Sequence, residues 1–173
     1  MVKKELNVEK ARLETPACQK IIHFNNAGAS LMPEPVLNTL INYLKLEANI
    51  GGYEAAAKEQ EKIESTYDTI ALLINSRREE IALIENATRA WDMAFYSIPF
   101  KVNDRILTGQ AEYASNYLAY LQLSKRIGIS IDVIPNDNYG QISISALKES
   151  IDESVKLISI THIPTNSGLV NPV

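Results

Sequence analysis

Short apolar runs and amphipathic stretches alternate along the chain from about residue 80 onward. Runs of four or five apolar residues rich in β-branched side chains are typical of buried strands, while apolar residues at i, i+3 and i+4 are typical of helices. The predicted strands are 81–84, 105–108, 130–134 and 156–160, and the predicted helices are 117–127, 143–151 and one that begins at 87. This order predicts an α/β fold, a mainly parallel sheet with helices on both faces.

The first half of the chain is predicted to be mostly helical. Residues 1–20 are polar and aperiodic and read as an N-terminal arm, and 21–24 reads as a short strand. Two amphipathic helices are expected next, one starting near Pro33 and the other covering roughly 54–74. The predicted domain organisation is therefore an arm at 1–20 and an incomplete large domain at 21–173, with a helical lead-in at 33–75 and an α/β part at 80–173.

The strongest local signal lies where the strand predicted at 81–84 meets the next helix. Asn86 is a favoured helix-capping residue, so a helix is expected to begin at Ala87. Its first backbone N–H groups, with the hydroxyl of Thr88, would form a seat for a phosphate group. An ordinary Asn-capped helix that holds nothing explains the same residues.

Polar segments follow three of the predicted strands. They are residues 86–88, 109–116 and 161–168. In open α/β sheets ligands collect at the carboxyl ends of the strands, so the three segments are expected to share one site. His162, at the end of a strand, is expected to be a satisfied polar residue rather than a base.

Composition narrows the class of protein. The 173 residues carry a net charge of −4 without long blocks of either sign, which argues against nucleic acid or membrane surfaces as partners. No apolar run approaches the ~20 residues of a membrane span, and residues 1–5 do not resemble a signal peptide. The single cysteine, Cys18, excludes an internal disulfide and a cysteine-built metal site and is expected to pack rather than react. A cytoplasmic protein without a metal is predicted.

Several motifs, taken together, resemble one enzyme family. The chain is similar to the class V aminotransferase and cysteine desulfurase group of pyridoxal 5'-phosphate (PLP) enzymes, which have the type I aminotransferase fold. The resemblance covers nearly the whole chain. The matching motifs are His23-Phe24-Asn25-Asn26-Ala27-Gly28, Gly51-Gly52-Tyr53-Glu54-Ala55, Glu85-Asn86-Ala87-Thr88, Glu112-Tyr113-Ala114-Ser115-Asn116, and Thr161-His162 through Gly168 to Pro172.

The resemblance implies roles for particular residues. Ala87 and Thr88 would bind the PLP phosphate, Tyr113 would stack on the pyridine ring, and Thr165 or Asn166 would reach the phenolic oxygen. The substrate entrance would be lined by Asn26, Ala27 and Gly28. Many desulfurases have a histidine where this chain has Tyr113, which argues against a desulfurase. Other interpretations remain open: a core aromatic for Tyr113, a turn without a ligand at 164–168, and a plain loop at 26–28.

The family's Schiff-base lysine and its pyridine-binding aspartate come later in the family pattern than the segment ending at Pro172. The expected function is therefore the N-terminal portion of a PLP enzyme acting on an amino acid, by transamination or cysteine desulfuration. Alone it would be inactive, with no catalytic residue of its own and non-covalent PLP at best. A non-catalytic phosphate-ligand-binding or protein-interaction module is the alternative. The family works as dimers, so a homodimer or a complementing second chain is expected.

Overall fold

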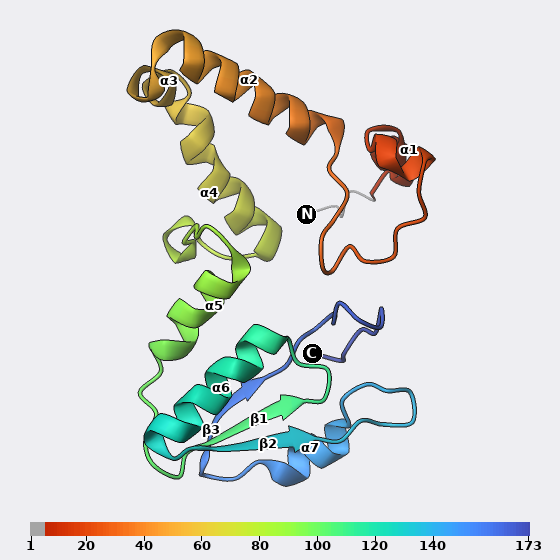
Figure 1. The fold of residues 1–173 in the computed structure, drawn as a ribbon, viewed down its shortest axis with the longest axis vertical. Coiled ribbons are helices and arrows are strands. Elements are labelled where there is room, and N and C mark those ends of the chain that lie inside the picture. Colours follow the sequence, from red (N-terminus) through yellow and green to blue (C-terminus); the bar gives the residue numbers. More distant parts are fainter. Residues whose placement is uncertain (1–5) are drawn as a thin grey trace. The chain divides into compact units, whose positions relative to one another are not determined.

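The computed structural model describes residues 6–173, which form two compact units (Figure 1). Unit 1 consists of residues 6–23 and Ser30–Leu83, and unit 2 consists of Phe24–Ala29 and Ile84–Val173. None of the helices in this described part of the chain is long and apolar enough to cross a membrane.

Unit 1 is helical. Its elements are α1 (Val8–Leu13), a 3-10 turn (Pro16–Gln19), α2 (Glu34–Ile50), α3 (Gly52–Lys58), α4 (Gln60–Ile74) and a second 3-10 turn (Arg78–Glu80). The predicted helix near Pro33 is α2, with Pro35 in its first turn, where the missing N–H has no cost. The predicted single helix at 54–74 is divided at Glu59, whose backbone (φ −100°, ψ 11°) leaves the helical range.

The segment expected to be an aperiodic arm contains a capped helix. The side chain of Asn7 accepts the N–H of Lys10 at 2.9 Å and so starts α1. Cys18, expected to pack, is exposed at the surface of the following 3-10 turn. This expectation was wrong because the turn has no apolar layer to enter: none of its residues is buried.

Unit 1 buries little apolar surface. Within the described residues its buried apolar side chains are Ala55 and Ala71. The apolar face of α2 remains in contact with solvent, with exposed fractions of 38–63% for Val36, Leu37, Leu40, Ile41 and Leu44. Helices in water owe most of their stability to packing of such a face, so α2 lacks its main source of stabilisation within this unit.

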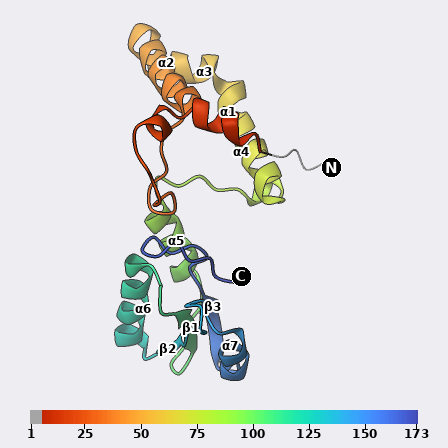
Figure 2. The ribbon, with the colours of Figure 1, turned by 90° about the vertical axis from the view of Figure 1, so that its right-hand side faces the viewer.

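Unit 2 has the predicted α/β architecture. Its elements are α5 (Ala87–Tyr96), β1 (Arg105–Gly109), α6 (Ala114–Ile127), β2 (Ser130–Ile134), α7 (Ile144–Ser150) and β3 (Val155–Ser159). The three strands are parallel and lie in the order β2–β1–β3. Figure 2 shows α6 and α7 on opposite sides of this sheet. The prediction of a mainly parallel sheet with helices on both faces is confirmed.

The two faces of the central strand β1 carry separate apolar clusters. Successive residues of a strand point to opposite faces, and Ile106 and Leu107 are both fully buried. Ile106 packs with Phe95 of α5 and Tyr120 of α6, while Leu107 packs on the other face with Ile134 and residues of α7. β1 is thus the buried centre of unit 2. Packing on both faces holds this strand in place, and with it the residues that follow its carboxyl end.

Two predicted strands are absent from the described residues. Residues 21–24 and 81–84 have no regular secondary structure and pair with no strand there. An apolar run forms a strand only when a neighbour offers hydrogen bonds along its length, and neither segment pairs with the three-stranded sheet. The expectation that a strand runs directly into α5 was therefore wrong, although the helix itself is where it was predicted.

The start of α6 also differs from the prediction. The helix begins at Ala114, three residues before the predicted start, and Tyr113 occupies the capping position without a side-chain cap bond. Ser115 and Asn116 lie in the first turn, and the side-chain amide of Asn116 donates to Glu112 at 2.9 Å. The helix therefore begins at the residue after Tyr113, and the Glu112 carboxylate contacts its first turn.

Candidate ligand-binding site

The N-terminus of α5 forms one end of the candidate site. As predicted, the side chain of Asn86 caps the helix, accepting the N–H of Arg89 at 2.9 Å. The backbone N–H groups of Ala87 and Thr88 have no partner inside a helix that begins at this point. These two groups and the positive end of the helix dipole favour a negatively charged ligand.

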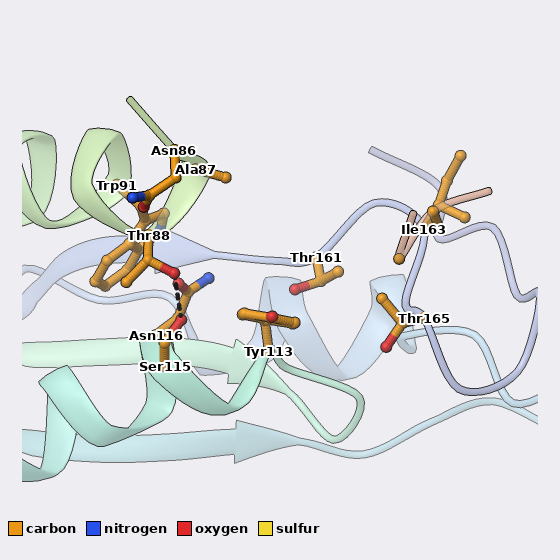
Figure 3. A pocket seen from close by; sticks show the side chains of 12 residues that line it. Asn86, Ala87, Thr88, Trp91, Tyr113, Ser115, Asn116, Thr161, Ile163 and Thr165 are labelled. Atoms are coloured by element: carbon orange, nitrogen blue, oxygen red, sulfur yellow. Dashed lines mark hydrogen bonds between the residues drawn. The ribbon is translucent and has the colours of Figure 1, made fainter. Parts of the chain in front are cut away.

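A cavity of about 470 Å³ opens beside this helix end, entirely within unit 2 (Figure 3). Its volume lies in the range of small-molecule sites. Twelve residues line it: Ala27, Gly28, Asn86, Ala87, Thr88, Trp91, Tyr113, Ser115, Asn116, Thr161, Ile163 and Thr165. Apart from Trp91 of α5, they come from the 24–29 loop and from the three polar segments at 86–88, 109–116 and 161–168. The predicted meeting of these segments is observed, although 86–88 follows no strand.

Two helix N-termini converge at one end of the cavity. Figure 3 shows the hydroxyl groups of Thr88 in α5 and Ser115 in α6 facing each other, and their oxygen atoms are 3.5 Å apart. Among the twelve lining residues there is no lysine, arginine or histidine. An anion at this end would therefore be held by hydroxyl and N–H groups and by helix dipoles rather than by a cationic side chain.

Tyr113 provides the aromatic wall of the cavity. It lies just before α6, half exposed, and belongs to neither apolar cluster of unit 2. Tyr117 and Tyr120, by contrast, contact each other at 5.9 Å between ring centroids on the core side of α6. A core role for Tyr113, the alternative from the sequence, is excluded because the residue precedes the helix and does not share that face.

The segment after β3 forms the third wall. Thr161, Ile163 and Thr165 line the cavity, and the buried side chain of Asn171 ties the base of this segment. Its amide donates to the carbonyl of Thr161 at 2.7 Å and its carbonyl accepts the N–H of Ile142 at 3.0 Å. Residues 161–171 are therefore held as a loop whose two ends are fixed together.

The structure brings together six of the eight residues proposed from the sequence. Ala27, Gly28, Ala87, Thr88, Tyr113 and Thr165 all line the cavity, whereas Asn26 and Asn166 are not among the lining residues. Asn166 instead accepts a hydrogen bond from the hydroxyl of Thr165 at 3.3 Å. Between Thr165 and Asn166, left open by the sequence, Thr165 is the residue that faces the cavity.

Other lining residues were not singled out from the sequence. Ser115, Asn116 and Thr161 lay in the polar segments after strands, so their position carried a signal. Trp91 did not, because its helical spacing fits the apolar face of α5 equally well. It lies half-buried, stacked on Phe95 at 4.6 Å between ring centroids, and still borders the cavity.

The lining fits a flat phosphorylated ring such as PLP. It has an end rich in hydrogen-bond donors at Thr88 and Ser115, an aromatic surface at Tyr113, and the small residues Ala27 and Gly28, which leave room for a ligand. Fold and cavity together define an α/β protein with a cavity of small-molecule size at the carboxyl edge of a parallel sheet, the place where proteins of this architecture bind ligands. The chain belongs to the aminotransferase class-V family, whose model matches residues 22–173.

Curated relatives include cysteine desulfurases. The chain is 28% identical over 170 residues to the probable cysteine desulfurase of Pyrococcus abyssi and 29% identical over 180 residues to that of Xylella fastidiosa. Each match covers 95% of this chain and 42% of the relative. The chain thus spans less than half the length of these relatives, and the expectation of a match to only part of the family's length is confirmed.

Solved structures share the fold. The apo structure of the cysteine desulfurase from Thermococcus onnurineus matches with a TM-score of 0.82 at 24% identity, covering 98% of this chain and 44% of that protein. A C-DES mutant with glycine covalently linked to its PLP cofactor matches with a TM-score of 0.81 at 19% identity, covering 93% of this chain and 43% of that one. The partial α/β fold predicted from the sequence is therefore that of known PLP-dependent proteins.

Proposed function

We propose that this chain supplies the front part of a PLP-dependent class V aminotransferase-like enzyme that acts on an amino acid, with PLP held in the cavity of unit 2. The observation that carries the proposal is the meeting of the α5 and α6 N-termini at Thr88 and Ser115, in a cavity that also presents the Tyr113 ring. An anion-binding end and an aromatic wall are the two features that a phosphorylated pyridine ring requires.

Each group of lining residues has a proposed role. Ala87 and Thr88 bind the phosphate, Tyr113 stacks on the pyridine ring, and Thr165 contacts the phenolic oxygen. The loop that contains Ala27 and Gly28 borders the amino acid substrate. When bound, PLP supplies an electron sink for negative charge on the substrate's α-carbon. The residues of this chain hold and orient the cofactor.

The covalent anchor is proposed to lie outside this set of residues. The cavity lining in the described chain contains no lysine, and lysine is the residue that forms a covalent link with PLP. We therefore expect non-covalent binding and no turnover by this chain alone. The same observation favours the second candidate, a non-catalytic module that binds a phosphorylated ligand or a partner protein.

The chain offers a built-in probe for binding. Trp91 is its only tryptophan and borders the cavity, so its fluorescence should be quenched when a ligand enters. Pyridoxamine 5'-phosphate is the probe of choice because it has no aldehyde and cannot react with surface lysines. We expect saturable quenching, which Thr88→Val weakens about tenfold, the effect of losing one hydrogen bond to a charged group.

The control is Thr69→Val, which removes an exposed hydroxyl from α4 in unit 1 and should leave the affinity unchanged. Inorganic phosphate should compete with the probe, whereas pyridoxine, which lacks the phosphate, should compete weakly. Equal affinity of the Thr88 variant and the wild type would contradict the phosphate seat. Borohydride trapping of PLP on one unique lysine would contradict non-covalent binding.

A further inference from the structure

Glu112 lies at the junction of the segments that build the cavity, although it does not line the cavity itself. Its carboxylate accepts four hydrogen bonds: at Oε1 from the N–H of Tyr113 (2.8 Å), Nδ2 of Asn116 (2.9 Å) and Oγ1 of Thr161 (2.6 Å), and at Oε2 from Oγ1 of Thr108 (3.0 Å). Three of the four donors belong to residues that line the cavity.

These four donors come from different elements. Thr108 lies in β1, Tyr113 precedes α6, Asn116 is in the first turn of α6, and Thr161 follows β3, 49 residues after Glu112. One carboxylate thus joins the end of the central strand, the start of a helix and the loop closed by Asn171.

We propose that Glu112 is the positioning residue of this cavity and that it sets the hydrogen-bonding polarity of one wall. An ionised carboxylate can only accept hydrogen bonds, so each neighbour must direct a hydrogen atom toward it. Thr161 has one hydroxyl hydrogen and uses it here, so only its lone pairs remain for a ligand. Asn116 commits one of its two amide hydrogens, which leaves its carbonyl oxygen and the second hydrogen.

The cavity consequently has two ends of opposite character. The α5 end offers donors, namely the N–H groups of Ala87 and Thr88, and the wall held by Glu112 adds acceptors, namely the lone pairs of Thr161 and the carbonyl oxygen of Asn116. A ligand that carries both a phosphate and separate N–H or O–H donors satisfies both ends, whereas inorganic phosphate uses only the donor end. Glu112 should therefore matter for pyridoxamine 5'-phosphate and little for inorganic phosphate.

The inference deepens the proposed function and rests on it for its ligand. Glu112→Gln is the sharpest variant because it replaces the charged acceptor of the hydrogens from Asn116 and Thr161 with a neutral carbonyl oxygen while keeping the size of the side chain. We expect this variant to lose about fivefold to tenfold in affinity for pyridoxamine 5'-phosphate, read from Trp91 quenching, the effect of about one lost hydrogen bond. Its affinity for inorganic phosphate should stay within about twofold of the wild type.

Two further variants serve as comparisons, one with a larger expected effect and one with none. Glu112→Ala removes every acceptor and should weaken pyridoxamine 5'-phosphate more than Glu112→Gln does. Glu149→Gln makes the same change of charge on an exposed residue of α7 whose side chain forms no hydrogen bond within the described part of the chain. This variant should bind like the wild type. Equal loss of affinity for both ligands in Glu112→Gln, or no loss for either, would overturn the proposed polarity.

A ligand-free measurement separates this inference from the proposed function. In Glu112→Ala, amide hydrogen exchange should accelerate at Tyr113 and across residues 161–171, while exchange at Ile131 in β2 stays at the wild-type rate. Faster exchange at Ile131 as well would make Glu112 a general stability residue and overturn the positioning role. If the wild type fails to quench with pyridoxamine 5'-phosphate, the proposed function fails, and the exchange data alone decide whether Glu112 orders the cavity.

Discussion

At the scale of single residues, the side chain of Tyr120 packs in the apolar core and also forms a hydrogen bond to the sheet. It is fully buried, packs against Trp91 and Phe95, and donates its hydroxyl hydrogen to Oγ of Ser159 at 2.6 Å. Burial disfavours the charged phenolate and raises the pKa of Tyr120 to about 12. The side chain therefore stays neutral throughout the physiological range and acts as a link between α6 and β3.

This raised pKa predicts a loss of stability at alkaline pH. The unfolded-state pKa of tyrosine is about 10, below the folded value, so the stabilisation from neutral Tyr120 is complete below pH 10 and is lost between pH 10 and about 12. Tyr120→Phe should be less stable at neutral pH by about 1 kcal/mol, because the hydrogen bond to Ser159 is lost. The difference from the wild type should shrink above pH 10.

Urea unfolding at a series of pH values measures the effect. Tyr139→Phe is the matched control, since Tyr139 is 87% exposed and should show a constant difference from the wild type over the same range. A gap between wild type and Tyr120→Phe that does not narrow above pH 10 would rule out a raised pKa for this residue.

At the scale of elements, the two ends of α6 are stabilised in different ways. Its N-terminus has no side-chain cap bond and is held by the Glu112 contacts, whereas its C-terminus ends at Gly128 in the left-handed conformation (φ +86°). The N–H of Gly128 donates to the carbonyl of Ser124 at 2.8 Å, and the chain then turns into β2. A glycine is needed at this position because side chains strain a positive φ.

Gly128→Ala should therefore destabilise unit 2. The expected cost is about 1–2 kcal/mol, the penalty of the left-handed conformation for a residue with a Cβ atom. Gly128→Asn should cost less, because asparagine tolerates this conformation better than alanine. Thermal and urea unfolding followed by circular dichroism would measure both, and an alanine variant as stable as the asparagine variant would contradict the conformational explanation.

Periodicity in the sequence was sufficient to predict the three strands of the sheet. Strands β1, β2 and β3 lie within a residue of their predicted positions, because each run finds a neighbour in the sheet. The runs at 21–24 and 81–84 look the same in sequence but have no neighbour within the described chain. Strand formation depends on a pairing partner, which the run itself does not encode.

At the scale of the whole molecule, the main feature is the uneven distribution of apolar burial between the units. Unit 2 has two apolar clusters on the faces of its sheet, whereas the apolar face of α2 in unit 1 is exposed to solvent. Exposed apolar faces of this kind mark interaction sites in soluble proteins. This supports the expectation of a homodimer or a complementing chain, which remains a prediction.

Self-association is the form of this prediction that can be measured directly. The purified chain should sediment as a dimer at micromolar concentration, and Leu40→Glu, which places a charge on the apolar face of α2, should shift it to the monomer. Asn42→Glu adds the same charge on the other side of α2 and should leave the dimer intact. A wild-type chain that is monomeric at every concentration would leave only a complementing chain as the partner.

The sequence by itself determined the features that depend on neighbouring residues. The Asn86 cap, the start of α5, the extent of the three sheet strands and the family of the chain could all be read from it. Local hydrogen bonds, backbone sterics and periodic burial involve residues only a few positions apart. A short stretch of sequence is therefore enough to predict them. Six of the eight proposed site residues line one cavity, and for Tyr113 and Thr165 the reason is that the parallel strands β1 and β3 end at a common edge.

Only the tertiary structure decided which distant residues meet. Residues 81–84 do not form the predicted strand, and α6 begins at Ala114. Asn26 and Asn166 do not line the cavity, whereas Trp91 does. The tertiary structure also places Glu112 against Thr161, 49 residues away. Contacts of this range depend on how whole elements pack, and a carboxylate that joins three of them carries no local pattern that would reveal its partners.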